Sequence, residues 1–203
     1  SPHEQDHMNP VDIVIMAAGK GTRMKSRLPK VLHRLAGRPL LAHVLDGAAA
    51  LGVRSMVVVT GHGAAEVEAF CAGWAATACD GGTPSVRTVR QEPQLGTGHA
   101  VQQAVPVLPD DGITLILNGD TPLIHASTAQ ALIDACAGKQ LALLTIRLDD
   151  PTGYGRIVRD ETGVKVLAIV EHKDATPEQR AICEVYTGMM AAPTARLKHW
   201  LSQ

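Results

Sequence analysis

An apolar run that stops at a glycine-spaced loop constrains the fold of this chain more than any other stretch. Ile13-Val14-Ile15-Met16-Ala17-Ala18 leads directly into Gly19-Lys20-Gly21-Thr22-Arg23-Met24. A continuous β-branched run is typical of a strand buried in a parallel sheet, and the carboxyl end of such a strand can present backbone N–H groups to an anion. The stretch predicts an α/β fold with a phosphate-binding loop after its first strand.

Charge supports the phosphate interpretation. No Asp or Glu occurs between Ile13 and Leu45, although the whole chain has a net charge of −1. The same window holds seven of the 19 Lys and Arg residues, namely Lys20, Arg23, Lys25, Arg27, Lys30, Arg34 and Arg38. Clustered cations raise the local concentration of anionic ligands. The alternative is a solvated basic loop, which the preceding strand and the two glycines make the weaker interpretation.

Spacing excludes two familiar phosphate loops. A P-loop needs a second glycine five residues after the first, but Met24 and Ser26 stand at those positions after Gly19 and Gly21. A dinucleotide fingerprint needs a third glycine where Met24 stands. The loop matches instead the signature of sugar-phosphate nucleotidyltransferases, in which a glycine-spaced Thr-Arg-Met loop is followed by Pro29-Lys30.

Composition indicates a globular domain. The 203 residues are 45% hydrophobic and 19% charged, which predicts a polar tail over residues 1–10 and one domain over residues 11–203. No apolar run is long enough for a membrane span and the tail lacks the apolar core of a signal peptide, so we expect a cytoplasmic protein without a membrane partner. Aromatic residues make up 2%, too few to stack bases, so we expect no nucleic acid partner.

Two further residue types are expected to have no role in chemistry. The four cysteines, Cys71, Cys79, Cys136 and Cys183, form no Cys-x-x-Cys pair and are interpreted as reduced core thiols. Five histidines near helix starts show no metal-ligand spacing and are interpreted as surface or turn residues, namely His33, His43, His62, His99 and His125.

Strand-like and helix-like segments alternate along the chain. Strands are predicted at residues 12–17, 56–60, 86–90, 113–117 and 141–148, and helices at 40–51, 64–71, 99–105 and 127–137, the last with Ser127 as N-cap. Residues 72–84, rich in glycine and small residues, are expected to form a loop that can contain helix. Two strand-like runs at 154–159 and 164–170, joined by a hairpin turn, precede a strand at 183–191 and a helix at 194–201. The pattern predicts a doubly wound, mostly parallel, Rossmann-like sheet with a β-hairpin insertion after Leu148.

Ligands of such folds bind beyond the carboxyl ends of the strands, where several informative residues lie. Asp120 follows a buried strand and a glycine, so it can present Mg²⁺ to a nucleotide or form an Asx turn. Gly96 and Thr97 can hold a base close to the backbone or only open a helix. Gly155 can be a turn residue alone, and Glu171 can accept sugar hydroxyls or face water.

Motifs for a nucleophilic side chain are missing from the sequence. This is compatible with phosphoryl transfer. An attacking group that is itself an ionised phosphate needs no general base, so catalysis reduces to alignment and charge neutralisation.

Six stretches together resemble one family. They are Met16–Met24, Leu28–His33, Gln94–Ala100, Gly119-Asp120, Asp150–Ile157 and Ile169–Ala175. They resemble the bacterial N-acetylglucosamine-1-phosphate uridylyltransferases, the N-terminal half of bifunctional enzymes that are also glucosamine-1-phosphate acetyltransferases. The resemblance runs from about Val11 to the end of the chain.

The resemblance implies a set of site residues and ligands. Uridine would contact Met16, Ala17, Ala18, Gly19, Gln91, Gly96 and Thr97, with Asn118 and Gly119 lining the same pocket. Phosphates would bind Arg23 and Lys30, Asp120 would be a Mg²⁺ ligand, and Gly155 and Glu171 would contact the sugar. The implied reaction joins UTP and N-acetylglucosamine 1-phosphate to UDP-N-acetylglucosamine with release of pyrophosphate, for peptidoglycan and lipopolysaccharide synthesis.

Two departures from the family pattern stand out. Tyr186 occupies a position where the family usually has a sugar-contacting Asn. The chain also stops at Gln203, before the usual domain end with its Asn-containing segment for the second metal ligand, and before the β-helix domain. Family members trimerise through that β-helix, so we expect this chain to be monomeric and its activity to be impaired. The rival interpretations are a transferase for another sugar or alditol phosphate, and a catalytically silent nucleotide-binding domain.

Overall fold

The chain folds as two compact units. The computed structural model describes residues 9–19, 28–77, 84–121 and 126–202. The first unit takes in the chain up to Ala142 and again from Ala191, and the second is Leu143–Met190. None of the described helices is long and apolar enough to cross a membrane.

A parallel sheet forms the centre of the first unit. Its strands lie in the order β5 (Ser85–Arg90), β4 (Ser55–Thr60), β1 (Val11–Ala17) and β6 (Ile113–Asn118), and each neighbouring pair is parallel. Ile13, Val14 and Ile15 are completely buried. A strand covered on both faces has no reason to alternate with polar residues, which explains the continuous apolar run in the sequence.

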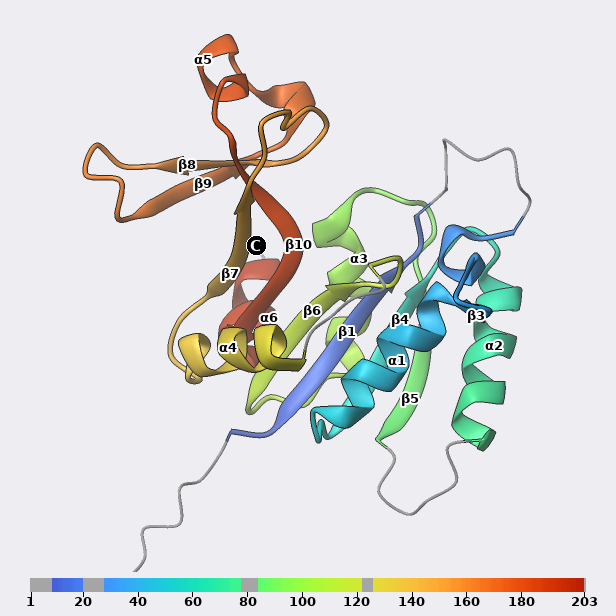
Figure 1. Cartoon of the computed structure of the whole chain (residues 1–203). Helices are drawn as coiled ribbons and strands as arrows, with labels where there is room; N and C mark the ends of the chain where they lie inside the picture. The colour runs from blue at the N-terminus through green and yellow to red at the C-terminus, as the bar shows by residue number, and fades with distance from the viewer. Residues whose placement is uncertain (1–8, 20–27, 78–83, 122–125, 203) are drawn as a thin grey trace, which may run out of the picture. The chain divides into compact units, whose positions relative to one another are not determined.

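Helices cover both faces of this sheet, as Figure 1 shows for α1 in front and α3 behind. The helices of the first unit are α1 (Leu40–Ala50), α2 (Ala64–Thr77), α3 (Thr97–Ala104), α4 (Ala126–Cys136) and α6 (Thr194–Leu201). Helix α1 contacts α4, while α3 contacts α6. Short elements join them: the 3₁₀ turns Lys30–Leu32 and Val105–Val107 and the two-residue strands β2 (Arg34–Leu35) and β3 (Arg38–Pro39).

The second unit is antiparallel. Its strands are β7 (Ala142–Arg147), β8 (Arg156–Arg159), β9 (Val166–Val170) and β10 (Glu184–Pro193), the last of which continues into the first unit. Strand β8 pairs with β10 on one side and β9 on the other, and β7 also pairs with β10. A 3₁₀ turn, His172–Asp174, and the short helix α5 (Pro177–Arg180) separate β9 from β10. The predicted fold class, with its parallel sheet and hairpin insertion, is confirmed.

Helix α2 extends to Thr77, six residues into the segment expected to be a loop that can contain helix, because Trp74 is buried there and its Nε1–H donates to Asp46 Oδ1 at 2.9 Å. Two local predictions were wrong. Ser127 is not an N-cap, since it is the second residue of α4. Cys183 is exposed at the turn before β10, whereas Cys71 and Cys136 are buried thiols as expected. Cys79 and His125 lie outside the described residues.

Candidate active site

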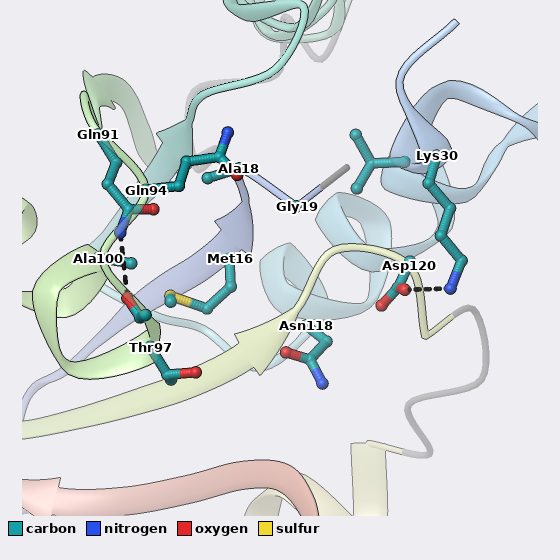
Figure 2. Close-up of a pocket in the computed structure, with 12 residues that line it drawn as sticks. Met16, Ala18, Gly19, Lys30, Gln91, Gln94, Thr97, Ala100, Asn118 and Asp120 are labelled. Atoms are coloured by element: carbon teal, nitrogen blue, oxygen red, sulfur yellow. Dashed lines mark hydrogen bonds and ion pairs between the residues drawn. The ribbon is translucent and has the colours of Figure 1, made fainter. Parts of the chain in front are cut away.

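A cavity of about 470 Å³ lies at the carboxyl ends of β1 and β6. Figure 2 shows its lining, which comes from the strand ends, the 3₁₀ turn at Lys30, the segment after β5 and the start of α3. The lining residues are Met16, Ala18, Gly19, Lys30, Val31, Gln91, Gln94, Gly96, Thr97, Ala100, Asn118 and Asp120. Most of the residues predicted for the nucleotide are therefore brought together in one place.

Two predicted residues support this cavity without lining it. Ala17 is buried at the last position of β1, between the two lining residues Met16 and Ala18. Gly119 donates its N–H to Met16 O at 2.9 Å. A Cβ at Gly119 would lie 3.1 Å from Met16 O and 3.2 Å from Val31 Cγ1, so a larger residue would have to displace its neighbours by a few tenths of an ångström where β6 ends beside β1.

Gln91 is a buried, hydrogen-bonded polar group in the lining of the cavity. Its side chain is buried, and its Nε2 donates to Gly96 O at 3.0 Å and lies 3.0 Å from His99 Nδ1. Since Gly96 O can only accept, the amide nitrogen must face it. The amide oxygen is thereby directed away from Gly96, toward the side of Met16 and Gln94 (Figure 2).

The turn that Gln91 holds depends on a special backbone conformation. Gly96 precedes α3 with a φ of 107°, a region that residues with a Cβ rarely adopt. Gly96 O also accepts the Ala100 N–H at 3.0 Å. The same carbonyl thus starts the helix and fixes the Gln91 amide. His99, which was expected to be a surface or turn residue, takes part in this arrangement through its ring.

Lys30 and Asp120 form an ion pair at the opposite side of the cavity. Lys30 Nζ lies 2.9 Å from Asp120 Oδ2, and their side chains are 50% and 31% exposed (Figure 2). The predicted phosphate-binding cation and the predicted metal ligand are therefore neighbours. Both remain accessible to a ligand from solvent.

The predicted sugar residues meet within the second unit. Tyr186 donates its backbone N–H to Gly155 O at 2.9 Å, and a Cβ at Gly155 would lie 3.9 Å from both Glu171 carboxylate oxygens. The Tyr186 hydroxyl is buried without a hydrogen-bond partner among the described residues. Burial, together with the negative charge of Glu171, raises the pKa of the Tyr186 phenol above its usual value.

The predicted cluster of cations is only partly confirmed. Of the seven basic residues, Lys20, Arg23, Lys25 and Arg27 lie outside the described residues. Lys30 lines the cavity, but Arg34 donates to Gly37 O at 3.2 Å and Arg38 pairs with Asp46. The last two belong to the β2–β3 hairpin, so the acid-free window serves at least two separate purposes.

Three residues that line the cavity were given no role of their own, although they lie in stretches that resemble the family: Val31, Gln94 and Ala100. Gly61, after β4, allows close packing: a Cβ there would lie 2.7 Å from Gln94 Nε2 and 2.9 Å from Ala18 Cβ. A lone glycine at a predicted strand end was the available signal, because such a residue often marks a close backbone approach.

Comparisons with known proteins identify the family of this chain. The family model of the MobA-like NTP transferase domain matches residues 13–181. The chain is 64% identical over 198 residues to "Bifunctional protein GlmU" of Polaromonas naphthalenivorans, and 68% identical over 194 residues to the protein of that name from Methylibium petroleiphilum. These matches cover 97% and 95% of the chain but 41% of each relative, so the chain spans about two fifths of the length of these curated relatives.

Solved structures share the fold. A UDP-glucose pyrophosphorylase complexed with UDP-glucose superposes with a TM-score of 0.76 at 18% identity, covering 93% of this chain and 78% of that one. HddC from Yersinia pseudotuberculosis gives 0.70 at 21% identity, covering 95% and 80%. At such identities the likeness shows the fold alone. The family match and the GlmU relatives show that the chain belongs to the MobA-like NTP transferases, and its resemblance to the nucleotidyltransferase part of the bifunctional GlmU proteins is confirmed.

Proposed function

We propose that this chain transfers the uridylyl group of UTP to N-acetylglucosamine 1-phosphate in the cytoplasm, giving UDP-N-acetylglucosamine and pyrophosphate. Family membership supports sugar-phosphate nucleotidyl transfer in general. The choice of base and sugar rests on the motif resemblance and on the side chains of the site.

The Gln91 amide carries the choice of base. Its nitrogen is engaged by Gly96 O and His99 Nδ1, which leaves the oxygen as the group for a ligand. An oxygen acceptor matches the N3–H of uracil or thymine, whereas cytosine has an acceptor at N3. With CTP, the Gln91 oxygen and cytosine N3 would face each other as two acceptors without a proton between them. Such an unsatisfied buried pair costs free energy, so CTP should be rejected. Gln91 does not distinguish UTP from dTTP.

The reaction needs neutralised phosphates more than it needs a general base. An oxygen of the sugar phosphate attacks the α-phosphorus of UTP, the bond between the α-phosphorus and the bridging oxygen breaks, and pyrophosphate leaves with that oxygen. Lys30 is placed to balance the negative charge on the phosphates, a role we also propose for Arg23. Asn118, on the end of β6, would border the same ligand.

The donor set fits Mg²⁺ shared with a substrate. No group of three or more His, Cys, Asp or Glu side chains among the described residues could hold a metal by itself. Mg²⁺ commonly takes only one or two carboxylates beside substrate phosphates and water. Asp120 would be that carboxylate, and bound Mg²⁺ would supply charge neutralisation at the phosphates.

Glu171, Gly155 and Tyr186 are proposed for the sugar. The Glu171 carboxylate is exposed and can accept hydroxyl hydrogen bonds, while the buried Tyr186 hydroxyl has no hydrogen-bond partner in the described part of the chain. A phenol has one O–H and no carbonyl, so it cannot reproduce both the donor and the acceptor of the usual Asn. Glu171→Ala should raise KM for the sugar phosphate and leave the KM for UTP nearly unchanged.

Pyrophosphate release with a matrix of substrates tests the proposal. UTP, dTTP and CTP are each combined with N-acetylglucosamine 1-phosphate, glucose 1-phosphate and an alditol phosphate. We expect release with UTP and N-acetylglucosamine 1-phosphate and little with CTP. Preference for another sugar or alditol phosphate would identify a different transferase. Tight UTP binding without any release would identify a silent nucleotide-binding domain.

A further inference from the structure

His99 joins the buried Gln91 amide to the first turn of α3. Its ring Nδ1 lies 3.0 Å from Gln91 Nε2. At the other side of the ring, Gln103 Nε2 lies 3.3 Å from His99 Nε2 and also donates to His99 O at 3.1 Å. Both ring nitrogens therefore meet a side-chain amide, although His99 does not itself line the cavity.

The chemistry of the ring decides which of the two contacts takes its lone pair. A neutral imidazole has one N–H and one nitrogen that can accept. Gln91 Nε2 donates one hydrogen to Gly96 O at 3.0 Å, so it meets His99 Nδ1 with its second hydrogen. Gln91 is only 3% exposed, and an unmade hydrogen bond there would be costly.

Gln103 has less need of the ring. Its contact with His99 Nε2 is the longer of the two, and its side chain is partly exposed, so water can take its second N–H. The lone pair therefore belongs on Nδ1 of His99 and the proton on Nε2. Gln103 can match this N–H by turning its amide oxygen toward the ring.

We propose that His99 is a positioning residue for base selection: its unprotonated Nδ1 accepts the second N–H of Gln91 and so holds the Gln91 oxygen toward the bound base. Both amide hydrogens are then engaged by protein, and the oxygen is left for the ligand (Figure 2). The proposal rests on the proposed function in one respect, namely that the cavity binds a nucleotide whose base carries an N3–H.

A rotated Gln91 amide would select a different base. Turned by half a revolution, it would present its NH₂ group to the ligand, which matches the acceptor N3 of cytosine. Its oxygen would then face Gly96 O, which cannot donate, and could bond to His99 only if the ring carried its proton on Nδ1. The observed orientation makes two hydrogen bonds and the rotated one at most one. His99 and Gly96 together therefore favour uracil and thymine over cytosine.

Calorimetric titration with UTP, dTTP and CTP, without a sugar phosphate, tests this role. His99→Leu removes the acceptor and should raise Kd for UTP and dTTP by the same factor, about 3–10-fold, which is the usual net contribution of one hydrogen bond. Kd for CTP should not rise. His99→Asn has the branching of leucine but returns an oxygen near the position of Nδ1, so it should restore Kd for UTP to within about twofold.

His43→Leu is the matched control. His43 is also a partly exposed helical histidine, and its Nε2 lies 2.8 Å from Leu35 O, but it belongs to α1 and does not line the cavity. This variant should bind UTP as the original chain does. Equal losses of affinity for UTP, dTTP and CTP in His99→Leu would show that His99 only supports the fold, and would overturn the proposal.

Nuclear magnetic resonance of the isotope-labelled chain reads the tautomer directly. The histidine ring signals that vanish in His99→Asn belong to His99, and we expect them to show the proton on Nε2 in the free chain and with UTP bound. A proton on Nδ1 would overturn the proposal, and so would a His99→Asn variant that binds UTP as weakly as His99→Leu. If the nucleotides bind as expected but no pyrophosphate is released, the proposed reaction fails while the role of His99 is upheld.

Discussion

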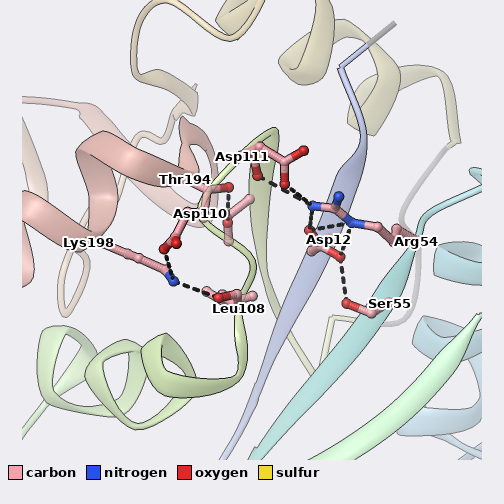
Figure 3. Close-up of polar contacts among 9 residues, drawn as sticks. Asp12, Arg54, Ser55, Leu108, Asp110, Asp111, Thr194 and Lys198 are labelled. Atoms are coloured by element: carbon pink, nitrogen blue, oxygen red, sulfur yellow. Dashed lines mark hydrogen bonds and ion pairs between the residues drawn. The ribbon is translucent and has the colours of Figure 1, made fainter.

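The charged groups at the two ends of β1 differ in how far they are exposed to solvent. At the start of the strand, Asp12 is completely buried and accepts from Arg54 Nη2 at 2.7 Å and Ser55 Oγ at 2.6 Å (Figure 3). At the far end, Lys30 and Asp120 are joined by one contact of 2.9 Å and remain 50% and 31% exposed. In the first pair the carboxylate is enclosed by protein, although Arg54 is 36% exposed, whereas in the second pair both side chains are open to a ligand.

Other polar groups at the start of the sheet are also internally satisfied. Thr114 and Thr194 share a buried hydrogen bond of 2.8 Å between their hydroxyls, and Lys198 donates to Leu108 O at 2.6 Å (Figure 3). Arg54 also contacts Asp111 and lowers the pKa of that carboxyl below its usual value. These contacts join strands and the C-terminal helix, so we interpret them as structural.

Burial separates charged pairs that stabilise the fold from pairs that can take part in chemistry. Removing one member of a buried pair leaves an uncompensated charge in a poor solvent, which costs stability. Removing one member of an exposed pair costs little stability. A pair that is both exposed and in a cavity is therefore the better candidate for chemistry.

Lys30→Ala should give the largest change of the substitutions considered, and it should lower catalytic activity without lowering stability. Losing a preorganised cation near the phosphates typically costs ~10²–10³ in rate, so kcat/KM for pyrophosphate formation should fall on that scale. The melting temperature should hardly change, because Lys30 is half exposed. Lys139→Ala, at an exposed position outside the cavity, is the matched control. Equal activity of the two variants would remove Lys30 from the machinery.

Arg54→Ala should do the reverse and destabilise the fold. Asp12 would stay buried without its guanidinium partner, which should cost about 3 kcal/mol, the lower end of the range for broken buried pairs because Arg54 is partly solvated. Urea denaturation measures the change, with exposed Arg196→Ala as control. KM for UTP should be unchanged at a temperature where the variant is folded. A large rise in KM without loss of stability would contradict the division between the two ends.

A third ion pair, Glu184 with Arg159, should make the stability of the fold depend on pH. Glu184 in the second unit is 11% exposed and bonds to Arg159 Nε at 2.7 Å and Thr145 Oγ1 at 2.8 Å. Mainly through its hydrogen bond with Arg159, the pKa of Glu184 falls to about 2. Because the folded pKa lies below the unfolded value of ~4.3, the stabilisation is present above about pH 5 and is lost as pH falls toward 2.

Glu184→Gln tests this assignment. The variant should be less stable at neutral pH by about 2 kcal/mol, and the difference from the original chain should shrink as pH falls toward 2. Urea denaturation at a series of pH values provides the measurement. Exposed Glu178→Gln on α5 should show no such convergence. A difference that is independent of pH would mean that Glu184 acts through packing and not through its charge.

The sequence allowed prediction of the parallel strands and of much of the cavity. Apolar runs such as residues 13–15 are long enough to show burial on both faces, and in a parallel sheet their ends point to the ligand. The register that pairs Met16 of β1 with Asn118 of β6 cannot be read from the sequence of either strand alone. This register nevertheless brings together residues that the motifs had already indicated.

The structural pairs could not be predicted in this way. Asp12 and Arg54 are 42 positions apart and meet only because β1 and β4 pair in a particular register. Helix α5 was missed because four residues give no helical period, although Thr176 and Gln179 form a capping box that a search for caps alone could have found. Local patterns predict elements, whereas contacts between distant elements depend on how those elements pair.

Gly61→Ala should give the smallest effect, a change at the nucleotide end alone. The added Cβ would lie 2.7 Å from Gln94 Nε2, 2.9 Å from Ala18 Cβ and 3.0 Å from Ala18 O, so both neighbours must shift. Gln94 is a flexible side chain, but the Ala18 backbone belongs to the cavity wall. We expect a cost of about 1 kcal/mol, seen as a rise of severalfold in KM for UTP.

Gly73→Ala in α2 is the matched control, because nothing lies within 4 Å of its added Cβ and alanine favours the helix. An unchanged KM in Gly61→Ala would mean that the end of β1 tolerates displacement, and that tight packing there does not set nucleotide affinity.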